Sequence, residues 1–74
     1  MSDVAILKKL GAAIRKVREA AGFSQDSFAD HIGMHRAYYS AIERGERNVT
    51  LATSARVASG LRKKMADLLG AADL

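Results

Sequence analysis

The spacing of the apolar residues is the feature that most constrains this fold. Apolar side chains recur three and four positions apart along nearly the whole chain, which is the period of an amphipathic helix, and no stretch alternates as a strand does. The stripes predict five short helices, at residues 4–20, 24–32, 35–44, 50–59 and 64–70. A glycine follows each stripe, at positions 22, 33, 45, 60 and 70, and we expect each glycine to end a helix.

The N-terminal ends of these segments carry helix-capping residues in three cases. The candidate N-caps are Ser2 or Asp3, Ser24 and Thr50, whereas Lys64, before the fifth segment, cannot cap as a serine would. Only the first helix exceeds about three turns, so the others need tertiary packing to be stable in water. The sixth glycine, Gly11, lies inside the first stripe and indicates either close helix packing or a frayed start.

Length and composition favour one small all-α domain that comprises residues 1–74. The chain has no cysteine, which excludes disulfides and thiolate metal sites and fits a reducing cytoplasm. The N-terminal segment starts with an acid and is not expected to be a signal peptide, and no apolar run reaches about 20 residues, so we expect a cytoplasmic protein with no membrane partner. The net charge of +4 favours a polyanionic partner, although many small domains are mildly basic.

The second and third predicted helices are separated by only about two residues around Gly33. A turn this short forces the two helices to cross steeply, as in a helix-turn-helix. If Tyr39 and Ile42 face the core, an outer stripe remains that contains no acid: Arg36, Ala37, Ser40, Ala41 and Arg44. Small side chains between two arginines suit a helix that enters the major groove of DNA, where Arg36 can donate to guanine O6 and N7. Tyr38 lies at the edge of this stripe, and we expect its ring to be free to contact a base, sugar or phosphate.

The stretch SQDSFADHIGMHRAYYSAIERGERN resembles the Cro/repressor-type (Xre-like) helix-turn-helix family, and the resemblance runs from about Leu10 to Leu69. HRAYYSAIERGERNVTL is most like the controller proteins of restriction–modification systems. The resemblance implies a compact five-helix, lambda-repressor-like DNA-binding domain, with the helix-turn-helix formed by helices 2 and 3. It also implies a homodimer that binds double-stranded DNA and regulates transcription.

Residue roles follow from the resemblance together with the outer stripe. The expected base contacts are Arg36, Ala37, Tyr38 and Ser40. The expected contacts to the DNA backbone are Gln25, His35, Arg44, Arg47, Asn48 and Thr53. The family also pairs an arginine of helix 1 with a glutamate of helix 3, which implies a structural ion pair between Arg18 and Glu43, partly buried.

The fifth helix is expected to form the dimer interface. Its apolar residues cannot all face one way at their spacing: Met65, Leu68, Leu69 and Leu74. A domain this small gains stability if it buries the remainder against a copy of itself, and a two-fold dimer is the commonest closed arrangement. Such a dimer would place two recognition helices about 34 Å apart, which matches half-sites about 10–10.5 bp between centres.

Other chemistries lack the necessary residues. His31 and His35 have a zinc-like spacing of four, but Gly33 lies between them and no cysteine or carboxylate completes a ligand set. No catalytic constellation is evident, and we expect no enzyme activity, no cofactor and no small-molecule ligand. The alternative to a DNA-binding regulator is a protein-interaction or antitoxin-type module on the same fold, although we expect no toxin-wrapping tail beyond Leu74.

Overall fold

The computed structural model describes residues 2–74, and within them the chain forms five helices and no strand. The helices are α1 (Asp3–Ala20), α2 (Gln25–His31), α3 (Arg36–Glu43), α4 (Leu51–Gly60) and α5 (Met65–Ala71). These bounds lie within one residue of those predicted from the apolar stripes. Three helices begin at the expected N-caps, where the hydroxyl groups of Ser2, Ser24 and Thr50 each accept a backbone N–H three residues ahead.

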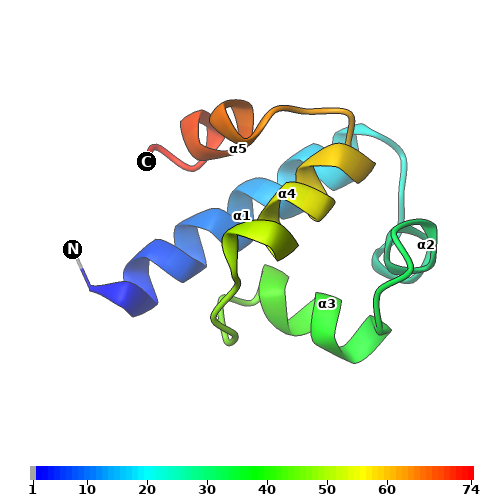
Figure 1. The fold of residues 1–74 in the computed structure, drawn as a ribbon, viewed down its shortest axis with the longest axis horizontal. Coiled ribbons are helices and arrows are strands. Elements are labelled where there is room, and N and C mark those ends of the chain that lie inside the picture. Colours follow the sequence, from blue (N-terminus) through cyan, green and yellow to red (C-terminus); the bar gives the residue numbers. More distant parts are fainter. Residues whose placement is uncertain (1) are drawn as a thin grey trace.

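The long helix α1 is the frame on which the others pack. It contacts α3 along one side and α5 along another, while α2 packs on α3 and α4 packs on α5 (Figure 1). The start of α1 and the C-terminal end lie on the same side of the molecule in Figure 1, and the pair α2–α3 lies away from α5. The largest fully buried side chains come from all five helices: Ile14, Phe28, Tyr39, Val57 and Leu68.

The turn between α2 and α3 has a regular hydrogen-bonded geometry. Gly33 takes a left-handed backbone with φ +64°, and its N–H donates to the carbonyl of Asp30 at 3.1 Å. The next N–H, of Met34, donates to the carbonyl of Ala29 at 2.8 Å, which completes a Schellman motif. Met34 and Ala29 are both buried, so the turn packs against the core.

Gly11 permits close packing between α1 and α3, which decides between the two alternatives that the sequence left open. A Cβ at this position would lie 2.6 Å from the carbonyl oxygen of Ile42 and 2.5 Å from that of Glu43. Since real Cβ atoms do not approach a carbonyl oxygen so closely, only glycine fits without a shift of one helix. The contact fixes the distance between α1 and the C-terminal end of α3.

Two of the five glycines that were predicted to end a helix do not take the left-handed backbone that ends one. Gly60 is the last residue of α4 and Gly70 lies within α5, and neither has a positive φ. The left-handed residues that follow these helices are instead Arg62 (φ 57°) and Asp73 (φ 59°). At each of them, its own N–H and that of the next residue donate to helix carbonyls, as they do at the glycines after the other helices. These hydrogen bonds hold a left-handed backbone here despite the side chain.

The start of α5 is stabilised without a capping serine. The backbone N–H of Lys64 donates to the carboxylate Oδ2 of Asp67 at 2.9 Å. An acid in the first turn also suits the positive end of the helix dipole. Asp67 therefore offsets the unsuitable N-cap that the sequence predicted at Lys64.

Candidate nucleic-acid interface

A buried ion pair ties the third helix to the first. The guanidinium of Arg18 donates to Glu43 through Nε, at 2.6 Å to Oε2, and through Nη2, at 3.0 Å to Oε1. Its Nη1 donates to the carbonyl of Phe23 at 2.8 Å. The side chains of Arg18 and Glu43 are only 7% and 2% exposed, so the expected pair is present and is more deeply buried than predicted. Planar two-point contacts of this kind fix orientation as well as supply energy.

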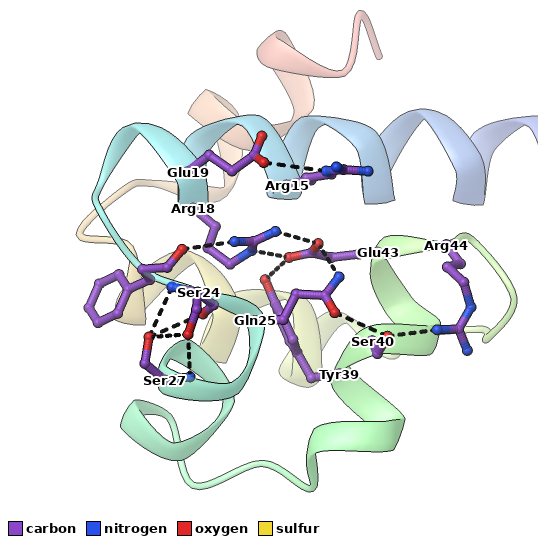
Figure 2. Close-up of polar contacts among 11 residues, drawn as sticks. Arg15, Arg18, Glu19, Ser24, Gln25, Ser27, Tyr39, Ser40, Glu43 and Arg44 are labelled. Carbon is purple, nitrogen blue, oxygen red and sulfur yellow. Dashed lines mark hydrogen bonds and ion pairs between the residues drawn. The ribbon is translucent and has the colours of Figure 1, made fainter.

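Two further side chains donate to the same carboxylate (Figure 2). The hydroxyl group of Tyr39 donates to Oε2 of Glu43, and the amide Nε2 of Gln25 donates to Oε1 at 2.9 Å. Burial alone raises the pKa of Glu43, but the hydrogen bonds from Arg18, Tyr39 and Gln25 and the charge of Arg18 outweigh it, so the net pKa is lowered. Glu43 is thus an ionised acceptor shared by three helices.

The same network reaches the outer face of α3. The carbonyl oxygen Oε1 of Gln25 accepts the hydroxyl group of Ser40 at 3.3 Å, and Nη1 of Arg44 donates to that hydroxyl oxygen at 2.6 Å. Arg44 also pairs with the exposed Glu46 at 2.9 Å. Gln25 and Ser40, which are also predicted DNA contacts, are half-buried and link the ion pair to Arg44 (Figure 2). Nothing in the sequence pattern indicated which way the Gln25 amide would turn.

Two of the four predicted base contacts on α3 are exposed. Arg36 and Ala37 lie exposed in the first turn of α3, directly after the exposed N-cap His35. Arg36 is not free, however, because Nη2 lies 2.7 Å from Oδ2 of Asp30 and Nη1 lies 3.4 Å from Oδ2 of Asp26. The stripe itself carries no acid, but the neighbouring helix α2 supplies two. The steep crossing of α2 and α3 brings these two acids beside Arg36. The crossing was predicted from the sequence, but the contact between the acids and Arg36 was not.

The ring of Tyr38, which was expected to be free, is not free. The ring is half-buried against the core, and the guanidinium carbon of Arg47 lies 5.1 Å from its centroid, which is a cation–π contact. Beside them is a shallow hollow of about 300 Å³, lined by His35, Ala37, Tyr38, Ala41 and Arg47. The first turn of α3 and Arg47 thus border one concave surface.

The remaining predicted backbone contacts lie near this surface or at the start of α4. Arg47 and Asn48 are exposed in the loop after α3. Thr53 is half-buried in the first turn of α4, where its N–H donates to the capping hydroxyl of Thr50 at 3.0 Å.

Arg56, which sequence analysis did not single out, also supports the helix-turn-helix. It extends from α4 and donates to the carbonyl of Ile32 at 2.6 Å and to that of Gly33 at 2.8 Å. These carbonyls end α2 and have no partner within the helix. Arg56 therefore holds the turn of the helix-turn-helix against α4.

Metal and membrane chemistry find no support in the described residues. Within residues 2–74 there is no group of three or more histidine, cysteine, aspartate or glutamate side chains that could hold a metal ion. His31 stacks on Phe23 with 5.1 Å between the ring centroids. In the same part of the chain, no helix has the length and apolarity that a bilayer span needs.

The helix-turn-helix family profile matches residues 14–68, which contain the ion pair, the turn and α3. The chain belongs to the Xre-like helix-turn-helix family of DNA-binding regulators. Its relatives include the control protein C.MunI of Mycoplasma sp., 39% identical over 69 residues that make up 92% of this chain and 90% of the relative. The control protein C.SmaI of Serratia marcescens is 38% identical over 81% of this chain and 71% of the relative.

Solved structures of helix-turn-helix family proteins have the same fold. The clp gene regulator ClgR of Corynebacterium glutamicum superposes with a TM-score of 0.88 at 31% identity, over 92% of this chain and 87% of that one. The restriction–modification controller protein C.AhdI of Aeromonas hydrophila gives 0.80 at 37% identity, over 84% and 94% of the two chains. The predicted five-helix all-α fold and the predicted family are therefore both confirmed.

Proposed function

We propose that this helix-turn-helix regulator is a restriction–modification controller protein, which binds a pseudo-palindromic operator as a homodimer. The whole stretch 1–74 acts as one domain in this proposal, in the cytoplasm, where the DNA lies. The proposal is supported by relatives that are themselves control proteins and cover nearly the same length. It is also supported by the exposed face of α3, which a buried network holds in place.

The single observation that carries the DNA contact is that two exposed arginines lie at the first turn of α3, Arg36 within that turn and Arg47 over the ring of Tyr38. Arg36 is exposed in the first turn of α3, the part of a recognition helix that meets base edges. Arg47 borders the adjoining hollow over Tyr38, where a cation is suited to a phosphate. In this proposal Arg36, Ala37, Tyr38 and Ser40 contact bases, and the DNA backbone is contacted by Gln25, His35, Arg44, Arg47, Asn48 and Thr53.

Two substitutions test this division of roles in a gel-shift competition between genomic fragments and random DNA. Arg36→Ala should lower the preference for the operator over a one-base variant by roughly 5- to 100-fold. Arg47→Ala should weaken binding to all sequences alike and lower the salt slope by about 1 per subunit. Arg15→Ala removes the same charge from an exposed site on α1 and serves as the matched control.

The alternative class gives a different result in the same assay. A protein-interaction or antitoxin-type module without its own operator would show no preference for any genomic fragment over random DNA. Preference lost in the Arg15→Ala variant but retained in Arg36→Ala would also contradict the proposal, because α3 would then not be the recognition helix.

A further inference from the structure

The guanidinium of Arg36 is held from one side by the end of α2. Its Nε lies 3.3 Å from Oδ1 of Asp30 and its Nη2 lies 2.7 Å from Oδ2, so this carboxylate accepts from two adjacent nitrogens. The third nitrogen, Nη1, lies 3.4 Å from Oδ2 of Asp26, near the outer limit of a hydrogen bond. Asp30 is therefore the principal partner of Arg36, and Asp26 is a weaker one.

The N–H donors of Arg36 that do not bind Asp30 are the ones that can bind a guanine. A guanidinium carries five N–H donors in a planar fork. Asp30 accepts one from Nε and one from Nη2, so Nη2 keeps a second hydrogen beside the two on Nη1. These point away from Asp30 along the end of the fork, and together they can donate to O6 and N7 of one guanine. Only the long contact to Asp26 has to be given up.

The position of Asp30 is fixed by the turn that defines the motif. Its own carbonyl accepts the N–H of Gly33, and Arg56 holds the carbonyls of Ile32 and Gly33 from α4. The hydrogen bond from Arg36 lowers the pKa of the Asp30 carboxyl, so it stays ionised at neutral pH. Asp30 is thus a charged acceptor on a backbone segment that hydrogen bonds hold in place.

An acid beside a DNA-binding surface needs a reason, since it opposes the approach of a polyanion. Folding stability is not a sufficient reason. The side chains of Arg36, Asp26 and Asp30 are 57%, 67% and 58% exposed, and exposed ion pairs contribute little to the free energy of folding. Restricting a long flexible arginine before it binds is a better reason, because the entropy of ordering the side chain is then lost in advance.

We propose that Asp30 is a specificity-determining positioning residue, which aims the free end of the Arg36 fork at a guanine, while Asp26 occupies that end only until DNA replaces it. This inference rests on the proposed function, because it requires that Arg36 reads a base. It assigns different jobs to two acids on one helix, and those jobs can be separated.

The test uses the full chain with Asp30→Asn, Asp26→Asn and, as a control with the same charge change in an exposed pair on α1, Glu19→Gln. Binding is measured by fluorescence anisotropy on an operator duplex selected with the wild-type protein, on its variant at the guanine lost with Arg36→Ala, and on random DNA. Thermal melting is followed in parallel. Because the pairs are exposed, none of the three variants should lower the melting temperature appreciably.

The two acids should respond differently. Asp30→Asn should reduce discrimination at that one base pair by roughly 3- to 10-fold, without weakening the binding of random DNA. Asp26→Asn should strengthen the binding of operator, variant and random DNA to the same extent and leave discrimination unchanged. Glu19→Gln should alter neither discrimination nor the affinity for any of the three duplexes.

A double-mutant cycle isolates the path through Arg36. In the Arg36→Ala background, Asp30→Asn should cause no further loss of discrimination, because the residue it positions is absent. The inference is overturned if wild-type protein discriminates but Asp30→Asn discriminates equally well, or if Asp26→Asn loses as much as Asp30→Asn. It is also overturned if the loss persists without Arg36. Wild-type protein that shows no sequence preference at all would instead refute the proposed function.

Discussion

Glu43 shows at the scale of a single residue how one carboxylate joins the core to the recognition surface. It accepts hydrogen bonds from Arg18, Tyr39 and Gln25, which lie on three different helices. A buried charge is tolerated only when its lone pairs are occupied, and here both oxygens have two donors. The orientation of α3 relative to α1 and α2 therefore depends on this residue.

Loss of the charge at position 43 should be far more costly than loss of a charge in the loop that follows. Glu43→Gln leaves the buried Arg18 without its counter-ion, and breaking such a pair costs about 3–5 kcal/mol. Glu46 pairs only with the exposed Arg44, so Glu46→Gln should change stability by less than about 0.5 kcal/mol. Thermal melting compares the two, and equal shifts would rule out a special role for Glu43.

Glu43 should also make the stability of the folded protein depend on pH in the acid range. The pKa of Glu43 in the folded protein is lowered from its ordinary value of 4.5, so the unfolded chain takes up this proton first as pH falls. The stabilisation is complete above that ordinary value and is lost as pH falls through the folded pKa. Between pH 7 and pH 3, chemical denaturation should show that the free energy of unfolding falls more steeply for wild type than for Glu43→Gln. Parallel curves would contradict this assignment.

The residues also show where prediction from sequence ended. The Arg18–Glu43 pair followed from the family resemblance, since a spacing of 25 residues carries no local signal. The half-buried Tyr38 under Arg47 and the inward amide of Gln25 were missed, because a long side chain at a surface position can turn either way. That choice depends on neighbours from other helices, which local periodicity does not contain.

At the scale of helices, the apolar period gave reliable positions because each stripe had to face one core. The five predicted helices are all present, with ends within one residue of expectation. The left-handed residue that follows each helix was less predictable, since Arg62 and Asp73 take the position that was assigned to Gly60 and Gly70. Any residue can hold that position at a cost, so a nearby glycine is not decisive.

Two glycines inside helices should respond in opposite directions to alanine. Gly11→Ala would push a methyl group to 2.5 Å from the carbonyl oxygen of Glu43, so we expect a loss of about 1–3 kcal/mol as α1 and α3 move apart. Gly70→Ala meets nothing within 4 Å in α5 and should gain about 0.5–1 kcal/mol from helix propensity. Urea denaturation measures both. Stabilisation by Gly11→Ala would contradict the close packing of these helices.

At the scale of the whole molecule, the structure narrows the residues available for a dimer interface. Leu68 is fully buried within the protomer core, which removes it from the predicted set, and Met65 packs partly against the core. Leu69 and Leu74 remain 38% and 46% exposed on and after α5. These two residues are apolar, exposed and close in sequence, so the predicted interface now centres on them.

Charge at this surface should dissociate the proposed dimer without unfolding the protomer. Leu69→Glu should raise the dimer dissociation constant by at least about tenfold, because a carboxylate would be buried against its own copy. Sedimentation at high micromolar concentration measures it. Leu51→Glu, at the more exposed start of α4, is the matched comparison. Dissociation by Leu51→Glu alone, or a wild-type protein that is monomeric throughout, would contradict an interface on α5.

The central claim, that α3 reads DNA sequence, is tested most directly by selecting binding sites from a random duplex library with wild-type protein and with Arg36→Ala. Wild type should enrich an imperfect palindrome whose half-site centres lie about 10–10.5 bp apart. Arg36→Ala should enrich the same palindrome with the preference at one symmetric pair of guanines relaxed. Enrichment of no motif by wild type, or of an identical motif by both proteins, would contradict the account.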